Sequence, residues 1–137
     1  MKHEFGQKVF YSDTDAYGVV WHGSYLRWLE MGRVELCEKA GYSLTKLFDD
    51  DVTLPVAELN VRYKSPAKLE ENLLIETTLV EATRISMTFG QKIFNAENKK
   101  LHIDAKVKVV ATHNNGELYR NLPQDLVDFI EKVKING

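Results

Sequence analysis

Hydrophobic and polar residues repeat along this chain with two different periods. Between residues 23 and 40 apolar side chains return every three or four positions, as they do on one face of a helix. They are Tyr25, Leu26, Leu29, Gly32, Leu36, Cys37 and Ala40. From residue 57 to residue 112 the period becomes two, which is typical of strands with unlike faces. The pattern predicts a long amphipathic helix followed by a sheet.

Capping residues mark the predicted ends of the long helix. Ser24 or Gly23 can cap its start, and Gly41 can end it by adopting a left-handed conformation. On its polar face Glu35 and Lys39 have the order and spacing of an ion pair between successive turns. A shorter helical turn is expected at residues 43–48.

The strands are separated by connectors too short for parallel crossovers. We expect strands at residues 5–12, 57–64, 73–82, 84–95 and 101–112. In the last strand the apolar positions alternate with a polar face made of His102, Asp104, Lys106 and Lys108. Short connections join antiparallel neighbours. The prediction is an α+β fold in which the long helix packs on a curved antiparallel sheet of about five strands.

Pro123 begins a last predicted helix, whose expected apolar side lies at the end of the domain. That side is formed by Leu126, Val127, Ile130 and Val133.

Composition limits the chain to one globular domain. The 137 residues, 44% hydrophobic and 28% charged, support a single domain spanning 1–137 without a membrane span. A net charge of −2 gives no general attraction to nucleic acid or to an anionic membrane. Cys37 is the one cysteine, and no apolar run follows the charged N-terminus. These features suit the cytoplasm.

The densest cluster of polar, glycine and aromatic residues lies between the first strand and the long helix. It contains an Asp-x-Asp, a Gly-x-Val, a histidine, a tyrosine three residues later, and a Glu-x-x-Arg on the helix. The residues are Asp13, Asp15, Gly18, Val20, His22, Tyr25, Glu30 and Arg33. With this spacing and element order the chain resembles the hot-dog acyl-CoA thioesterases, in particular the 4-hydroxybenzoyl-CoA thioesterase family with its Tol/Pal-linked members.

The resemblance implies a catalytic role for Asp15. A thioester needs a nucleophile at its carbonyl carbon and hydrogen-bond donors where its oxygen gains charge. Asp15 can attack the carbon or take a proton from water. The backbone amides of residues 22–24, at the start of the helix, are the expected donors. His22 adds a donor or orients water in this interpretation.

The same resemblance assigns further residues to the substrate. The acyl site is expected to involve Tyr17, Gly18, Val20, Gly23 and Tyr25. Tyr17 stands where the family commonly has a small residue, so it reshapes the acyl pocket.

The CoA phosphates are assigned to Arg84, with Lys64 and Arg62 as weaker candidates. The family also implies a homodimer or homotetramer with each active site at a subunit interface. No metal or other cofactor is expected.

Several residues have structural interpretations. Asp13 is expected to hold the turn through bonds to backbone groups, and Trp21 and Trp28 to lie in the core or an interface. A Glu30–Arg33 salt bridge is expected to orient the helix.

Two more features receive a structural interpretation. The acidic run at residues 49–51 is interpreted as a solvated loop rather than a metal site. Cys37 is interpreted as a small core residue.

Three alternatives stay open at this stage. In another branch of hot-dog thioesterases, a His-Gly-Gly precedes a catalytic carboxylate on the helix. His22, Gly23 and Ser24 resemble this motif in part, and Glu30 would then be the base. A hot-dog hydratase fits less well, because its Asp and His stand closer together in sequence. The third alternative is a subunit that binds acyl-CoA without hydrolysing it.

Overall fold

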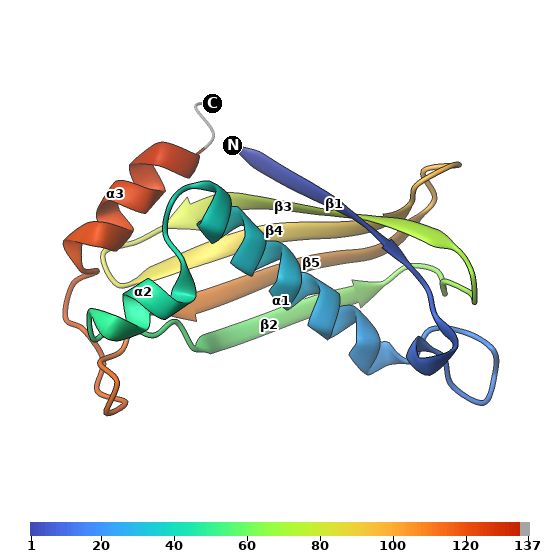
Figure 1. Ribbon diagram of the computed structural model, residues 1–137, viewed down its shortest axis with the longest axis horizontal. Helices are drawn as coiled ribbons and strands as arrows, with labels where there is room; N and C mark the ends of the chain where they lie inside the picture. The colour runs from blue at the N-terminus through green and yellow to red at the C-terminus, as the bar shows by residue number, and fades with distance from the viewer. Residues whose placement is uncertain (135–137) are drawn as a thin grey trace.

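A computed structural model describes residues 1–134 as one antiparallel sheet with helices on its concave side (Figure 1). The strands are β1 (Lys2–Lys8), β2 (Val56–Tyr63), β3 (Asn72–Ala82), β4 (Ser86–Asn95) and β5 (Leu101–Val110). Their order across the sheet is β1-β3-β4-β5-β2. The helices are α1 (His22–Lys39), α2 (Leu44–Asp49) and α3 (Gln124–Val133), with a 3-10 turn η1 (Tyr11–Asp13). This arrangement confirms the predicted α+β class.

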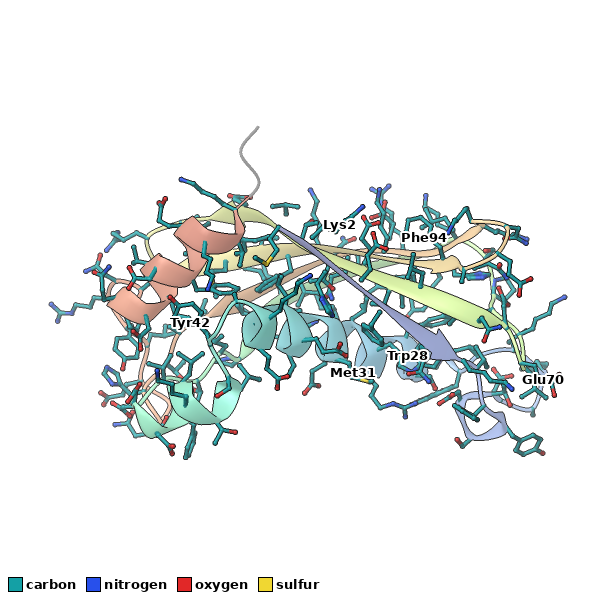
Figure 2. The ribbon with its side chains drawn as sticks, turned by 45° about the horizontal axis from the view of Figure 1, so that its top comes forward. Lys2, Trp28, Met31, Tyr42, Glu70 and Phe94 are labelled. Atoms are coloured by element: carbon teal, nitrogen blue, oxygen red, sulfur yellow. The ribbon has the colours of Figure 1, made fainter. Side chains whose placement is uncertain are left out.

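Helix α1 crosses the concave face of the sheet and divides the core into two clusters (Figure 1). One cluster gathers around its C-terminal half, α2 and α3, and the other around its N-terminal half and β1. Trp28, 1% exposed, anchors the second cluster and lies beneath β1 in Figure 2. Because this half of α1 is held so firmly, its first turn has a fixed place at one end of the sheet. Within residues 1–134, no helix has the length and apolar character needed to span a membrane.

The start of α1 differs from the expected capping. The helix begins at His22 with Trp21 as N-cap, so neither Gly23 nor Ser24 caps it. Ser24 lies inside the first turn, where its buried hydroxyl donates to the Asp13 carbonyl oxygen over 3.0 Å. At the other end Gly41 has φ +93°, which confirms the predicted left-handed stop.

Two predicted ion pairs on α1 are wrong. Among the described residues, Arg33 forms no salt bridge with Glu30, and its Nη1 donates instead to Gln91 Oε1 on β4. Glu35 does not pair with Lys39, because it accepts a hydrogen bond from His3 Nε2 on β1 over 3.1 Å. In both cases the side chain from α1 binds a residue of the sheet instead of another residue of the helix.

The predicted boundary of the first strand is also wrong. The strand was expected at 5–12, but β1 pairs with β3 from Lys2 to Lys8. Asp13 causes the early end, because its Oδ2 accepts from Phe10 N over 2.9 Å and closes the turn. The other strands begin and end within three residues of their predicted limits.

Burial corrects the predicted faces of β5 and α3. His102 was expected on the polar face of its strand, yet it is 2% exposed, because the connector between β2 and β3 covers it. In α3 the fully buried aromatic residue is Phe129, while Val127 remains 39% exposed.

Candidate active site

Asp15 lies in a small ribbon that leads directly into α1. Asp15 N donates to Val19 O over 2.9 Å, and Gly18 N donates back to Asp15 O over 3.0 Å. Gly18 has φ +78°, so this tight turn favours glycine. Residues 13–15 therefore lie beside residues 19–21, with Thr14 paired to Val20.

The Asp15 carboxylate is half-buried and makes one local bond. Its Oδ1 accepts from Tyr17 N over 2.8 Å, as in an Asx turn. Among residues 1–134, no side chain forms a salt bridge with it. The carboxylate is therefore oriented by the turn without being neutralised by a neighbouring cation.

The first amides of α1 supply free donors next to this ribbon. Trp21 N donates to Asp13 O and Ser24 N to Trp21 O, whereas the amides of His22 and Gly23 have no acceptor within the described chain. Such amides at a helix start favour a developing negative charge. A Cβ on Gly23 would lie 2.2 Å from the Trp21 ring, so a glycine is required here unless that ring moves.

Two tyrosines surround the helix start. Tyr25 Oη accepts from Ala67 N over 3.0 Å, and Tyr63 Oη donates to His22 O over 3.2 Å. Burial raises the pKa of Tyr25, the bond from Ala67 opposes this, and the charges of Glu71 and Asp15 add smaller upward contributions. Tyr25 is therefore a neutral hydroxyl.

Asp13 has the structural role expected of it, with a partner that sequence reasoning missed. Its buried carboxylate binds Phe10 N through Oδ2 and the Arg27 guanidinium through Oδ1, the latter over 2.5 Å. The sequence gives no signal for this pair, because Arg27 is one of several charged residues in the helix and lies 14 positions from Asp13. The pair joins the ribbon to the second turn of α1.

The remaining predicted site residues fall into two groups. Val20 is a buried residue of the ribbon, and Tyr17, which is 90% exposed, lies at the tip of the ribbon. Lys64 follows β2, whose end lies near the helix start (Figure 1). Arg84 lies in the β3–β4 turn, at the opposite end of the sheet, where its Nη1 donates to Arg120 O over 3.0 Å. The fold of one chain therefore does not bring Arg84 to Asp15.

A separate cavity opens beside the middle of α1. It has a volume of about 240 Å³ and is lined mainly by apolar side chains from α1, the start of β2 and the sheet. Its polar lining comes from Glu30 and Arg33. Burial lowers the pKa of Arg33, and it raises the pKa of Cys37, which also lines the cavity, to about 12. Cys37 is thus a neutral core thiol.

Comparison with known proteins identifies the family. Residues 17–102 match the family model of the thioesterase superfamily. The chain belongs to the thioesterase superfamily. This thioesterase is 37% identical over 120 residues to the acyl-CoA thioester hydrolase YbgC of Escherichia coli O6:H1, covering 88% of this chain and 89% of that protein.

Solved structures show the same fold. The 1,4-dihydroxy-2-naphthoyl-CoA thioesterase of Synechocystis superposes with a TM-score of 0.85 at 22% identity, over 95% of this chain and 96% of that one. A 4-hydroxybenzoyl-CoA thioesterase in complex with 4-hydroxybenzoyl-CoA gives a TM-score of 0.82 at 22% identity, over 93% and 97%. The hot-dog fold and the expected family are confirmed. The family match begins at Tyr17, so the role of Asp15 stays a prediction.

Proposed function

We propose that this thioesterase hydrolyses acyl-CoA esters and that Asp15 is its catalytic carboxylate. The supporting observation is that the Asp15 carboxylate, which forms no salt bridge in the described chain, lies on a short ribbon that leads directly into the helix start with the free amides of His22 and Gly23. The activity of the YbgC relative supports the substrate class. The ribbon supplies the base, and the first turn of α1 supplies the oxyanion donors.

The reaction can be written with Asp15 as a general base. The carboxylate takes a proton from water while the water oxygen bonds to the carbonyl carbon, and the carbonyl oxygen gains negative charge. The amides of His22 and Gly23 stabilise this charge, each donor contributing about 2.7–4 kcal/mol in a comparable hydrolase site. The C–S bond then breaks, and the departing CoA thiolate takes the proton from Asp15, which regenerates the carboxylate.

Direct attack by Asp15 is the second form of the same proposal. The carboxylate oxygen bonds to the carbonyl carbon, the CoA thiolate leaves, and water hydrolyses the resulting mixed anhydride. Both forms require the same carboxylate and the same donors.

Two isosteric substitutions test the assignment. Asp15→Asn should lower kcat by about 10²–10⁴-fold, because the amide neither accepts a proton nor attacks. Glu30→Gln is the matched comparison, since Glu30 would be the base in the alternative branch of hot-dog thioesterases. Turnover of several acyl-CoAs, followed by thiol release, is the measurement.

The two variants separate the alternatives. Loss of activity in Glu30→Gln with wild-type turnover in a folded Asp15→Asn would reject Asp15 and support the other branch. Binding of acyl-CoA to the wild type without release of thiol from any substrate tested would instead indicate a non-catalytic subunit.

We also propose that the enzyme works as a dimer formed through β2. This strand is at an edge of the sheet and, besides the charged Glu58 and Arg62, exposes Val56, Leu59 and Tyr63 by 47–51%, whereas the other edge strand, β1, exposes Lys2 and Glu4. Charged side chains discourage pairing of an edge strand, and apolar ones favour it. A homotetramer of two such dimers is the larger assembly expected from the sequence.

A two-fold axis pairs β2 with its copy in antiparallel orientation. The Tyr63 end, next to the helix start, then meets the Val56 end of the other chain, where Val56 lines the cavity beside Arg33. Each proposed active site would combine the Asp15 ribbon of one chain with the cavity of the other.

This pairing also gives Arg84 a possible substrate contact, because the β3–β4 turn of one chain lies toward the Asp15 end of its partner. Arg84→Ala should raise KM more than it lowers kcat, since CoA phosphates are bound equally in the ground and transition states. Steady-state kinetics with one acyl-CoA decides the point. A kcat loss at unchanged KM would reject this role.

The cytoplasm remains the proposed compartment, supported by a single buried, protonated thiol.

A further inference from the structure

A buried histidine closes a hydrogen-bonded cluster behind the Asp15 ribbon. His102 on β5 is 2% exposed, although its neighbours along the polar face of that strand are solvated lysine and aspartate side chains. The connector of residues 65–71 folds over it between β2 and β3. A buried imidazole needs a partner at each nitrogen, and here both partners come from this connector.

One ring nitrogen binds the end of the connector. His102 Nε2 lies 2.5 Å from Glu71 Oε1, which also accepts from Asn95 Nδ2 over 2.8 Å. Glu71 Oε2 accepts from Lys68 N over 2.8 Å. Partial burial alone would raise the pKa of Glu71, but the bonds from Asn95, Lys68 and His102 together hold it below its ordinary value. The carboxylate is therefore an ionised anchor.

The other ring nitrogen binds the start of the connector. His102 Nδ1 lies 3.0 Å from Ser65 O and 2.9 Å from Ser65 Oγ. The Ser65 hydroxyl donates to Leu101 O over 2.8 Å. Nδ1 therefore carries a hydrogen and cannot take the serine proton. A Ser–His–Glu arrangement is present, but it is not a nucleophilic triad.

The middle of the connector forms hydrogen bonds with the Asp15 ribbon. Ala67, fully buried, accepts from Val20 N over 2.9 Å and donates to Tyr25 Oη over 3.0 Å. Lys68 pairs with Val19 as an isolated bridge. The ribbon and the first turn of α1 thus both depend on a segment that His102 fixes at its two ends.

We propose that His102 is a positioning residue for Asp15, acting through residues 65–71. This inference rests on the proposed function of the Asp15 ribbon. Without the imidazole, the connector loses one contact at each end, and Ala67 no longer fixes the distance between the Asp15 carboxylate and the amides of α1. Misplacement by about 1 Å can reduce turnover by about 10²-fold while substrate binding is retained.

Three substitutions at His102 test the proposal. His102→Ala removes both contacts and should lower kcat by about 10- to 10²-fold with KM within about twofold of wild type. His102→Gln can still donate to Glu71, and His102→Asn can still donate to Ser65, so each should recover part of kcat. Melting temperatures are measured in parallel, and all kinetics are run well below the lowest one.

A matched control lies at the other end of the molecule. His113 also pairs with a carboxylate, Asp51, through Nδ1 over 2.6 Å, and its ring stacks on Tyr119 in the segment that follows β5, away from residues 65–71. His113→Gln should leave kcat unchanged, whatever it does to stability.

The outcomes separate this inference from the proposed function. A lower melting temperature with wild-type kcat in all three His102 variants would overturn it, as would a change confined to KM. If His102→Ala does not fold, wild-type kcat in both the Gln and Asn variants would overturn it equally. Wild-type turnover in Asp15→Asn would reject the proposed base, independently of what the His102 variants show.

Discussion

At the scale of single residues, Gly32 decides how closely α1 approaches the sheet. A Cβ at this position would lie 2.4 Å from Thr77 Oγ1 and 3.1 Å from Gln91 Nε2. Gln91 Nε2 donates to Leu29 O on the helix and to Thr77 Oγ1, both over 2.8 Å. The missing side chain therefore allows a buried amide to connect α1 to β3 and β4.

Gly32→Ala should destabilise the protein although alanine is the better helix former. The helix gains about 1 kcal/mol from alanine, but overpacking at a rigid contact costs about 1–3 kcal/mol, and the Gln91 bonds are strained as well. Urea unfolding measures the difference. The double variant with Thr77→Ala should recover part of the loss, because it removes the colliding oxygen. An increase in stability for Gly32→Ala alone would contradict the close approach.

At the scale of elements, side-chain hydrogen bonds set where segments end. Asp13 stops β1 and joins the ribbon to α1, while Glu71 fixes the connector of residues 65–71 against β4 and β5. Figure 2 shows Glu70, next to Glu71, at the same end of the molecule as the loop before α1. The position of the ribbon therefore depends on an ionised carboxylate outside it.

The Glu71 anchor makes a pH-dependent contribution to stability. Its pKa is lower in the folded state than the ordinary value of 4.5, so its stabilisation is fully present above pH 4.5 and is lost as the pH falls through the folded pKa. The difference in unfolding free energy between wild type and Glu71→Gln should therefore shrink on acidification from pH 7 to pH 3. Glu70→Gln serves as the control. A difference that stays constant with pH would contradict the ionised anchor.

At the scale of the whole molecule, the parts of the proposed active site lie far apart within one chain. The Asp15 ribbon lies at one end of the sheet, and the cavity beside Arg33 and the Arg84 turn lie toward the other. In the proposed two-fold dimer, the edge of β2 would connect these ends. If the site is built in this way, the proposed assembly is required for activity.

Mixed dimers test this shared site. Asp15→Asn removes the base, and Val34→Phe fills the cavity that Val34 lines. Each variant alone should be weakly active. Co-expression gives dimers with one intact site, so about a quarter of the wild-type turnover should return if chains pair at random. No recovery, despite mixed dimers detected by native mass measurement, would contradict a site built from two chains.

The sequence by itself determined the elements that a local pattern specifies. The period of α1, the alternation of β3 to β5, the left-handed Gly41 and the Asp13-to-Tyr25 motif all depend on residues a few positions apart, so the class, the family and the candidate base could be predicted. Tertiary structure alone decided the burial of His102, the contact of Arg33 with Gln91 and the distance of Arg84 from Asp15. Most of these depend on contacts between residues more than thirty positions apart, and a local period carries no information about which distant segment will cover a given side chain.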